Sequence, residues 1–335
     1  MNSKVYIILL NYNGWKDTIE CLESVLKNDY ENYQIIVVDN DSPNNSMEYI
    51  INWAEDKQEV IYDEDSQLKH LSQTHIPKPL PYVFYTKEDA LNGGDREKES
   101  KLNNPIIFIQ SGENGGFAAG NNIGIKYALS KDDFEYIWLL NNDTVVESKS
   151  LKSLVNYSEN NSCDICGTKI LNEDGSLNTY GGGFINSFTL RVRANINVDK
   201  IPDFISGASF FIGKKAIKEI GLMPEEFFLY FEDAEWTFIA KKHKMKLGMC
   251  KDAVITHRES QTTEKSSVLF LYYTTRAKIL FSKRFYPLKK YFFYFYLLVK
   301  SIVNIANGNI KVSKLIIHLL LAQDKFKSEK WKCYE

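Results

Sequence analysis

The sequence predicts an α/β protein with a mixed, mostly parallel β-sheet flanked by helices, followed by a C-terminal helical extension. Short apolar runs without alternation suit strands buried on both faces, and residues 136–140 form the clearest of them. These runs alternate with patterns of helical spacing, an order that predicts parallel strands joined by right-handed crossovers. Most runs stop at Asn, Asp or Gly, which mark turns.

Composition narrows the class of protein. A chain of 335 residues has room for one large α/β domain and an appendage. The formal net charge of -2 argues against nucleic acid as a partner. The first residues lack the long apolar region of a signal peptide, so we expect a cytoplasmic protein. The five cysteines suit a reducing compartment, and the Cys163/Cys166 pair has no second pair with which to bind zinc.

The first half of the chain repeats a strand-then-helix pattern. We expect a strand at 4–10, a helix at 15–27 and a second strand at 33–38 that ends at Asp39. The first turn, NYNG, is neither a dinucleotide fingerprint nor a Walker loop. In a doubly wound sheet, an acid after the second strand is positioned to contact a nucleoside. The alternative is that Asp39 only begins a turn.

The next stretch, residues 55–104, has a different character. Three prolines, a Gly-Gly pair and many charges interrupt any apolar period, so we expect a polar insertion that passes over the sheet, with local order at 82–85.

A third strand at 106–109 then precedes a glycine-rich turn and a helix. Such a turn can bind phosphate or sugar through backbone N–H groups. Asn114 and Asn121 add donors and acceptors for hydroxyl groups.

Polar residues follow the central strand directly. The sequence YIWLLNNDT continues from the apolar run into Asn141, Asn142 and Asp143. Sheets of this kind bind ligands beyond the carboxyl ends of their strands. Amide and carboxylate oxygens are ligands for a divalent cation that holds a diphosphate, although a simple polar turn is the alternative.

A second group of acids begins a later helix. After expected strands at 164–171 and 204–212, residues 225–248 have helical spacing, with Glu232 and Asp233 in the first turn. An ionised carboxylate there can act as a general base, although acids at helix starts are also common caps. Four aromatic residues at 227–231 favour a sugar pocket. A strand at 253–256 ends in His257, which is suited to a metal or a phosphate.

Seven motifs in order resemble family 2 glycosyltransferases, most closely the bacterial rhamnosyltransferase-like branch. They are NYNG, VVDNDS, NGGFAAGNNIG, LLNNDT, SGASFFI, FFLYFEDAEW and THRES, within residues 4–285. The resemblance implies a GT-A fold, a catalytic domain at 1–265 and inverting transfer from a nucleotide diphosphate sugar with Mg²⁺ or Mn²⁺. It also implies dTDP-L-rhamnose as the donor and a glycan or lipid-linked acceptor in surface polysaccharide synthesis. Another sugar from a UDP-sugar (galactofuranose, N-acetylglucosamine or glucose) and a non-catalytic nucleotide-sugar-binding scaffold are the alternatives.

The resemblance also implies roles for single residues. Asp233 matches the catalytic base, with Glu232 beside it, and Asp143 matches the last acid of the family's metal motif. The first acid of that motif is Asn141 here, so metal binding rests on Asp143, the donor diphosphate and His257. The residues implied for donor binding are Asn11, Asn13, Asp39, Asn114, Gly115, Asn121, Asn141 and Asn142.

The extension at 266–335 is basic and rich in aromatic residues. From Arg276 on, thirteen Lys and Arg stand against three Asp and Glu, a local excess of +10. Its apolar runs fall short of the roughly 20 residues that span a bilayer. Helices of this composition favour the interface of an anionic membrane, which predicts a location at the inner face of the plasma membrane. A helical hairpin packed on the catalytic domain or on another subunit is the alternative, so the oligomeric state stays open.

Overall fold

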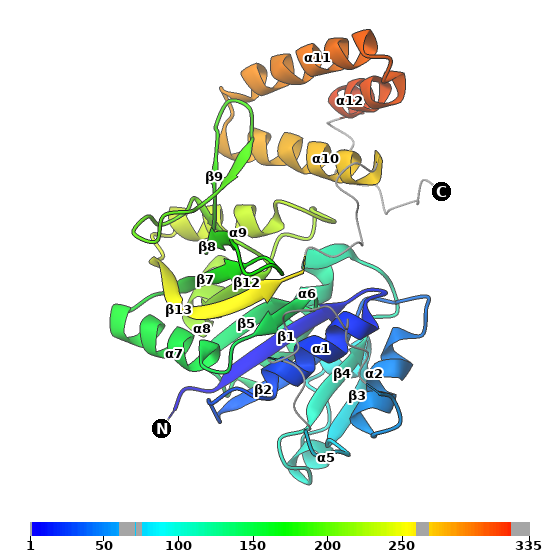
Figure 1. Ribbon diagram of the computed structural model, residues 1–335, viewed down its shortest axis with the longest axis vertical. Helices are drawn as coiled ribbons and strands as arrows, with labels where there is room; N and C mark the ends of the chain where they lie inside the picture. Colours follow the sequence, from blue (N-terminus) through cyan, green and yellow to red (C-terminus); the bar gives the residue numbers. More distant parts are fainter. Residues whose placement is uncertain (1, 60–70, 72–75, 259–267, 323–335) are drawn as a thin grey trace.

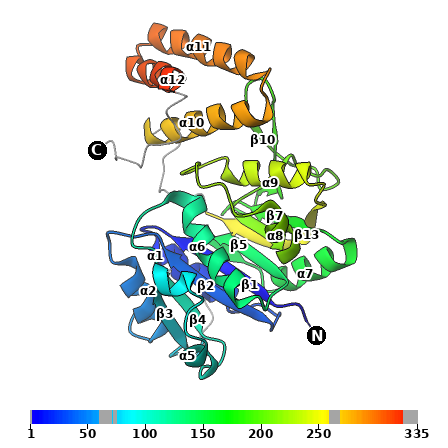
Figure 2. The same cartoon turned by 180° about the vertical axis from the view of Figure 1, so that it is seen from behind.

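The computed structural model describes residues 2–59, 71, 76–258 and 268–322. They form one large twisted sheet with helices on both faces, and a layer of three long helices at one end (Figure 1). Figure 2 shows the opposite side, where α6 and α8 lie in front of the sheet.

The large sheet is mixed and mostly parallel in its first half, which confirms the predicted fold class. Its strand order is β3-β4-β2-β1-β5-β12-β7-β13-β6, and β8 pairs with β7. Strands β3, β4, β2, β1 and β5 run parallel, whereas β12 runs antiparallel to both of its neighbours. The bounds are β1 Val5–Asn11, β2 Tyr33–Asp39, β3 Tyr82–Thr86, β4 Ile106–Gln110, β5 Tyr136–Asn141, β6 Thr144–Val146, β7 Ile165–Leu171, β8 Leu177–Tyr180, β12 Ser209–Gly213 and β13 Leu247–His257.

Two apolar cores lie on the two faces of this sheet. Alternate residues of β1 point to opposite faces, so Ile7 packs in one core and Ile8 in the other. Helices α1, α2 and α7 cover the first core, and α4, α6, α8 and α9 cover the second. The bounds are α1 Trp15–Val25, α2 Ser46–Ala54, α4 Lys87–Leu91, α5 Arg96–Ser100, α6 Gly116–Lys131, α7 Ser150–Asn161, α8 Lys214–Ile220 and α9 Glu232–Lys242.

The glycine-rich stretch is mostly helix, because α6 begins at Gly116. Its glycines bring the helix close to β1. A Cβ atom at Gly120 would lie 2.4 Å from Leu10, and one at Gly124 would lie 2.8 Å from Ile8. These two glycines therefore allow close packing of α6 on the sheet.

Two sequence expectations need correction. The run at 204–212 is not one strand, because Ser206–Ala208 form a turn between β11 (Phe204–Ile205) and β12. Part of the stretch at 55–104 is not an excursion over the sheet, because β3 pairs in parallel with β4 and forms the sheet edge. Strand β3 falls where the sequence indicated local order at 82–85, and its apolar residues Val83 and Tyr85 are buried. The alternation is too short to show that this segment pairs in the sheet.

A second, smaller sheet and the C-terminal helices form the remaining layer. The small sheet has the order β10-β9-β11, with β9 at Gly182–Ile185 and β10 at Val192–Ala194. The β9–β10 hairpin reaches the junction of two of the helices, where Phe188 lies edge to face against Phe292 (Figure 1). The helices are α10 Val268–Phe285, α11 Lys290–Ala306 and α12 Ile310–Ala322.

The C-terminal helices share an apolar core with α9 and the residues just before it. Phe281 of α10 contacts Phe231 and Phe238, with ring centres 5.3 and 4.9 Å apart, and Arg284 forms an ion pair with the buried Glu235. The proposed boundary at 265 lies outside the described residues. None of the helices in the described segments is long and apolar enough to cross a lipid bilayer.

Candidate functional site

The carboxyl ends of four parallel strands bring polar side chains into one row. In the strand register, Asn11 lies opposite Asp39, Asp39 opposite Gln110, and Asn141 opposite Leu10. The chain proceeds outward from β1 through β2 and returns to β5 on the other side of β1. The switch point of the sheet is therefore between β1 and β5, where open α/β sheets bind ligands.

Asp39 lies at the centre of a buried hydrogen-bond network. It accepts hydrogen bonds from Asn11 Nδ2 (2.6 Å), Gln110 Nε2 (2.9 Å) and both the hydroxyl and backbone N–H of Ser42 (2.6 and 3.0 Å). Its side chain is almost fully buried. The network fixes the carboxylate before any ligand arrives. Sequence reasoning missed Ser42 and Gln110, although Gln110 gives the same signal as Asn11, a polar residue at the end of an apolar run.

Asn40 connects this edge to the glycine-rich turn. Its amide donates to Asn114 Oδ1 (2.8 Å), and its carbonyl accepts from the N–H of Gly115 (3.3 Å). Asn114 Oδ1 also accepts from the N–H of Gly116 (3.0 Å). Asn13 joins the same edge, because its N–H donates to Ser42 Oγ (2.9 Å). Asn13 thus contacts Ser42, and Asn114 and Gly115 contact Asn40, the residue after Asp39. Their roles in donor binding stay predictions, and Asn40 was missed.

Asn121 and Asn142 make their shortest hydrogen bonds outside the network around Asp39. Asn121 lies inside α6 and is buried, and its amide donates to the carbonyl of Phe117 (3.0 Å). Asn142 points toward the start of α1, where its amide donates to Thr18 Oγ1 (2.9 Å). Asn121 therefore bonds the first turn of its own helix and Asn142 bonds α1, and their roles in donor binding stay predictions.

Asp143 and His257 meet although they are far apart in the sequence. Strand β13 pairs with β6 so that His257 lies opposite Thr144. This register puts His257 Nε2 3.1 Å from Asp143 Oδ1, and the N–H of Arg258 donates to the carbonyl of Asp143 (2.9 Å). Asp143 is buried and His257 is partly exposed. The pair lies at the switch point.

These residues fit a divalent cation that is held jointly with a ligand. No group of three or more His, Cys, Asp or Glu suited to a metal occurs among the residues that the structure describes. A closed protein cage for a metal is therefore absent from that part of the chain. Asn141 Oδ1 is buried and accepts no hydrogen bond from a described residue, and the amide nitrogen of Asn141 lies 3.4 Å from His257 Nε2. Mg²⁺ typically takes one or two carboxylates together with substrate phosphates, and this donor set leaves room for them.

Charged residues surround this pair. Arg258 reaches Glu20 of α1, with Nη2 3.1 Å from Oε1, and its Nε lies 3.2 Å from Glu173. Arg258 thereby links the end of β13 to α1 and to the turn after β7. Asp17 of α1 was also missed. Burial, and after it the negative charge of Asp143, raises the pKa of Asp17 to about 6, so these two carboxylates share one negative region.

The predicted base, Asp233, lies in the first turn of α9. Its two oxygens accept from the N–H groups of Gly207 (2.8 Å) and Ala234 (2.7 Å). Burial raises the pKa of Asp233 to about 6, and these N–H groups oppose that rise. Glu232 is buried beside it, and burial together with the charge of Asp233 raises the pKa of Glu232 well above its usual value. The two acids therefore differ, with Asp233 the one that ionises more readily.

The turn Ser206–Ala208 contacts both Asp233 and Asn141, the last residue of β5. The N–H of Gly207 donates to Asp233, and the carbonyl of the next residue, Ala208, accepts from the N–H of Asn141 (3.1 Å). One short turn thus contacts both the end of β5 and the predicted base. Sequence reasoning missed it because the apolar run at 204–212 hides the break.

The glycine-rich turn also contacts the loop before α9. Gly116 has a φ of +85°, and a Cβ atom there would lie only 2.3 Å from the carbonyl oxygen of Phe228. The N–H of Phe117 donates to that same carbonyl (2.8 Å). A side chain at position 116 would separate these two loops, so glycine is required there.

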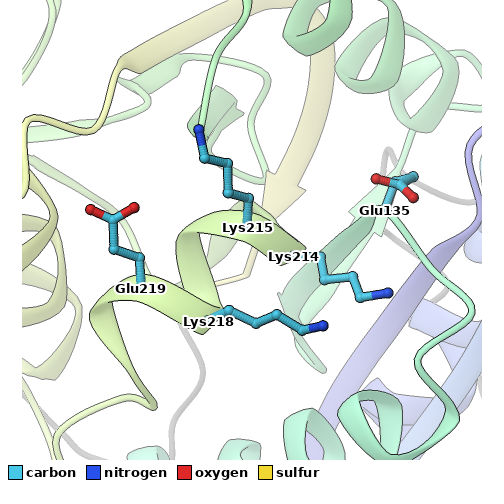
Figure 3. Close-up of a pocket in the computed structure, with 5 residues that line it drawn as sticks. All are labelled: Glu135, Lys214, Lys215, Lys218 and Glu219. Carbon is cyan, nitrogen blue, oxygen red and sulfur yellow. The ribbon is translucent and has the colours of Figure 1, made fainter.

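A separate hollow of about 500 Å³ lies beside the amino end of β5, at the opposite end of the strand from Asn141. Its lining residues are Glu135, just before β5, and four charged residues of α8 (Figure 3). Lys214 and Lys218 form ion pairs with Asp132, 2.8 and 2.9 Å long. Because Glu135 and Asn141 flank opposite ends of β5, this hollow is distinct from the switch-point site.

Comparison with known proteins agrees with this geometry. The chain matches the model of a family described as glycosyl transferase family 2, over residues 6–73 and 95–221. The chain belongs to glycosyl transferase family 2. The matched part includes the polar edge, the glycine-rich turn and Asp143, and it ends before α9. The predicted family is thereby confirmed.

Two curated relatives and one solved structure illustrate the range of this family. The chain is 28% identical over 170 residues to the low-salt glycan biosynthesis hexosyltransferase Agl10 of Haloferax volcanii, covering 48% of this chain and 55% of that protein. It is 24% identical over 261 residues to the dTDP-rhamnosyl transferase RfbF of Shigella flexneri, covering 77% and 70%. The match thus spans about half the length of the Haloferax protein.

The solved structure is the mannosyltransferase PcManGT from Pyrobaculum calidifontis, in complex with GDP-Man and Mn²⁺. Its TM-score is 0.53 at 12% identity, and the match covers 98% of this chain and 77% of that one. At this identity the likeness shows the fold alone. The predicted GT-A fold is confirmed.

Proposed function

We propose that this chain is an inverting glycosyltransferase that moves a hexose from a nucleotide diphosphate sugar to a hydroxyl group of a glycan or lipid-linked acceptor, in bacterial surface polysaccharide synthesis. Family membership supports the reaction class. The names of the relatives, a hexosyltransferase and a dTDP-rhamnosyl transferase, support a hexose and favour L-rhamnose from dTDP-L-rhamnose.

The observation that best supports this proposal is the turn at Gly207 and Ala208. It contacts Asp233 on one side and the end of β5 on the other. A base must lie within reach of the acceptor hydroxyl while the leaving group is held nearby. A scaffold that only bound nucleotide sugar would have no need for a carboxylate fixed in this way.

The roles of the residues follow from the site. Asp39, flanked by Asn11 and Asn13, would recognise the nucleoside, and Asn114 and Gly115 would line the donor pocket. Asp143 and His257 would hold Mg²⁺ or Mn²⁺, with Asn141 as a further oxygen ligand. When bound, such an ion neutralises charge on a diphosphate leaving group.

Asp233 would accept the proton of the acceptor hydroxyl. As that proton leaves, the hydroxyl oxygen bonds to the anomeric carbon, and the bond from this carbon to the donor diphosphate breaks on the opposite face. One base suffices for this inversion, whereas retention by double displacement needs a carboxylate nucleophile as well. The raised pKa of Glu232 keeps that neighbour from competing as a base.

A donor panel tests the proposal. Purified protein is incubated with dTDP- and UDP-sugars, with Mg²⁺, Mn²⁺ or chelator, and the released nucleotide diphosphate is measured. We expect release from one donor that chelator abolishes and that Asp143→Ala lowers by at least about tenfold, since metal-site mutations typically cost 10–100-fold. Asp252→Ala, an exposed acid on the same strand as His257, is the matched control. Release that survives both chelator and Asp143→Ala contradicts the metal assignment, and donor binding without transfer to any acceptor favours the scaffold.

The proposal includes peripheral contact with an anionic membrane, at the inner face of the plasma membrane. One side of α11 exposes large apolar side chains at helical spacing, and no acid occurs in residues 268–322. Such a basic and apolar surface suits a membrane interface. Co-sedimentation with anionic liposomes tests this, and protein that stays in the supernatant at low salt contradicts it. The exposed side chains are Tyr291, Phe292, Phe295, Leu298, Val299, Ile302, Val303 and Ile305.

A further inference from the structure

A hydrogen-bond relay of four side chains connects Asp39 to the turn that carries Asp143. Asn11 Nδ2 donates to Asp39 Oδ1 (2.6 Å), and Thr18 Oγ1 donates to Asn11 Oδ1 (2.9 Å). Asn142 Nδ2 in turn donates to Thr18 Oγ1 (2.9 Å). Asp39, Asn11 and Thr18 are almost fully buried, so water does not compete for the bonds between them.

The chemistry of Asp39 sets the direction of each bond in the relay. A carboxylate accepts from Asn11 only if the NH₂ end of that amide faces it, which leaves Oδ1 of Asn11 facing Thr18. The carbonyl of Gly14 also lies 2.9 Å from Thr18 Oγ1, but it already accepts from the N–H of Thr18 (2.9 Å). The one hydrogen of the hydroxyl therefore serves Asn11, and its lone pairs accept from Asn142. Thr18 thus needs its hydroxyl for both contacts.

The other end of the relay holds the residue next to Asp143. Asn142 lies in the turn between β5 and β6 and directly precedes Asp143. Its NH₂ group has three oxygen neighbours, of which Thr18 Oγ1 is the nearest at 2.9 Å. Asn11 Oδ1 and the carbonyl of Gly14 are both 3.4 Å away. The bond to Thr18 is therefore the shortest hydrogen bond from Asn142 to α1.

A bound donor would touch both ends of the relay. In the proposed function, Asp39 recognises the nucleoside and Asp143 helps to hold the cation on the diphosphate. Nucleoside and diphosphate are covalently joined, so the two carboxylates must keep a separation that matches the donor. Strand β1 lies between β2 and β5 in the sheet, and Thr18 packs under its end through Asn11.

We infer that Thr18 is a positioning residue for donor binding, because its hydroxyl holds the turn of Asp143 in place relative to Asp39. The inference rests on the proposed function. Thr18 is fully buried, so it acts through Asn142 and does not touch the donor. Without this hydroxyl, Asp39 still accepts three hydrogen bonds from outside the relay, whereas Asn142 loses its shortest one. The loss should therefore appear in the cation-dependent part of nucleotide binding.

Calorimetry with dTDP and UDP tests the inference, because binding of these nucleotides needs no acceptor. Affinity is measured with Mg²⁺ and with chelator, and the ratio of the two is the gain from the cation. Thr18→Val keeps the shape of the side chain and removes the hydroxyl. We expect it to lower this gain by about three- to tenfold, the range that one net hydrogen bond contributes. Thr18→Ser keeps the hydroxyl and should show the native gain.

The matched control is Ser24→Ala, which removes another fully buried hydroxyl of α1. Ser24 Oγ accepts from the N–H of Val146 in β6 (3.0 Å), so it fastens the same helix to the sheet without belonging to the relay. Ser24→Ala should lower the melting temperature and leave the gain from Mg²⁺ native. An equal loss of gain in Ser24→Ala and Thr18→Val would mean that Thr18 only stabilises α1, which would overturn the inference.

Further results would also contradict the inference. A native gain in Thr18→Val, or a loss in Thr18→Ser as large as in Thr18→Val, would overturn it. If Thr18→Val does not fold, Asn142→Ala removes the same bond from its other end, and a native gain in that variant would overturn it too. In the double variant the two losses should not add, because both changes break one bond. A native protein that binds neither nucleotide would instead count against the proposed function itself.

Discussion

The carboxyl edge of the sheet and the C-terminal helices differ in whether contacts within the chain satisfy their side chains. At the edge, the buried Asp39 accepts four hydrogen bonds from Asn11, Ser42 and Gln110. On α11, by contrast, Phe295 is 67% exposed and Ile302 is 66% exposed. The first region is complete within the chain, which suits preorganised binding of a small polar ligand. The second leaves apolar area in water, as expected of a surface that meets another apolar phase.

Asp233 belongs to neither region, so its substitution should lower transfer without changing donor affinity or vesicle binding. Asp233→Asn should lower transfer by roughly 10²–10⁴-fold, the usual contribution of a general base, with donor affinity and vesicle binding unchanged. Glu232→Gln is the control, because Gln resembles the protonated acid that burial favours at Glu232, so most activity should remain. Kinetics and calorimetry measure both. Normal transfer by Asp233→Asn would remove this residue from the mechanism.

The pH dependence of kcat/KM is a second test of Asp233 as the base. The pKa of Asp233 is raised to about 6, so this carboxyl gains its proton at a higher pH than an exposed Asp. As pH falls below that value the base form is lost, and kcat/KM should drop about tenfold per pH unit. Vesicle binding should not follow this limb, because the lysines stay charged there. A flat kcat/KM between about pH 5 and 7 would contradict the assignment.

Asp39→Asn tests whether the hydrogen-bond network at the carboxyl ends of the strands stabilises the fold. An amide there directs an NH₂ group at donors, so the free energy of unfolding should fall by about 1–3 kcal/mol. Asp41→Asn, at an exposed position two residues on, should change it by less than about 0.5 kcal/mol. Denaturant unfolding measures both. Equal stability of the two variants would mean that the Asp39 network does not stabilise the fold.

Phe295→Ser tests the opposite property of α11. The side chain is largely exposed, so unfolding should change by less than about 0.5 kcal/mol. Its insertion into an interface contributes about 1.5–3 kcal/mol, so affinity for anionic vesicles should fall about tenfold or more. Phe84→Ser on the edge strand β3 is the control. Unchanged vesicle binding would favour the packed-hairpin interpretation of the extension.

Sequence reasoning succeeded where a local pattern decides the structure. The strands that end at Asn11, Asp39 and Asn141 are buried on both faces, and an unbroken apolar run signals that directly. Where distant segments meet, the residue pattern by itself gave no contacts. The contact of His257 with Asp143, which only the family resemblance brought together, depends on the pairing of β13 with β6, and the contact of Asp233 with Gly207 depends on a break within an apolar run.

Exposed strands were missed and short strands were recognised only in part, for a physical reason. All three residues of β10 are exposed, so no alternation of apolar and polar residues marks it. At β3 the sequence indicated only local order, because the place of this strand in the sheet depends on its pairing with β4. Gln110 and Ser42 were missed as partners of Asp39 because their role is to hold another side chain, which no spacing along the chain reveals.

The uneven distribution of charge has a consequence for how the molecule approaches a surface. Residues 268–322 carry nine positive charges and no negative ones in a chain of net charge -2, so the remainder carries -11. The protein is therefore an electric dipole. In the field of a negatively charged surface it experiences a torque that turns α10–α12 toward that surface before contact. Screening confines this torque to about the last 8 Å at physiological salt, where it shortens the rotational search for a productive orientation.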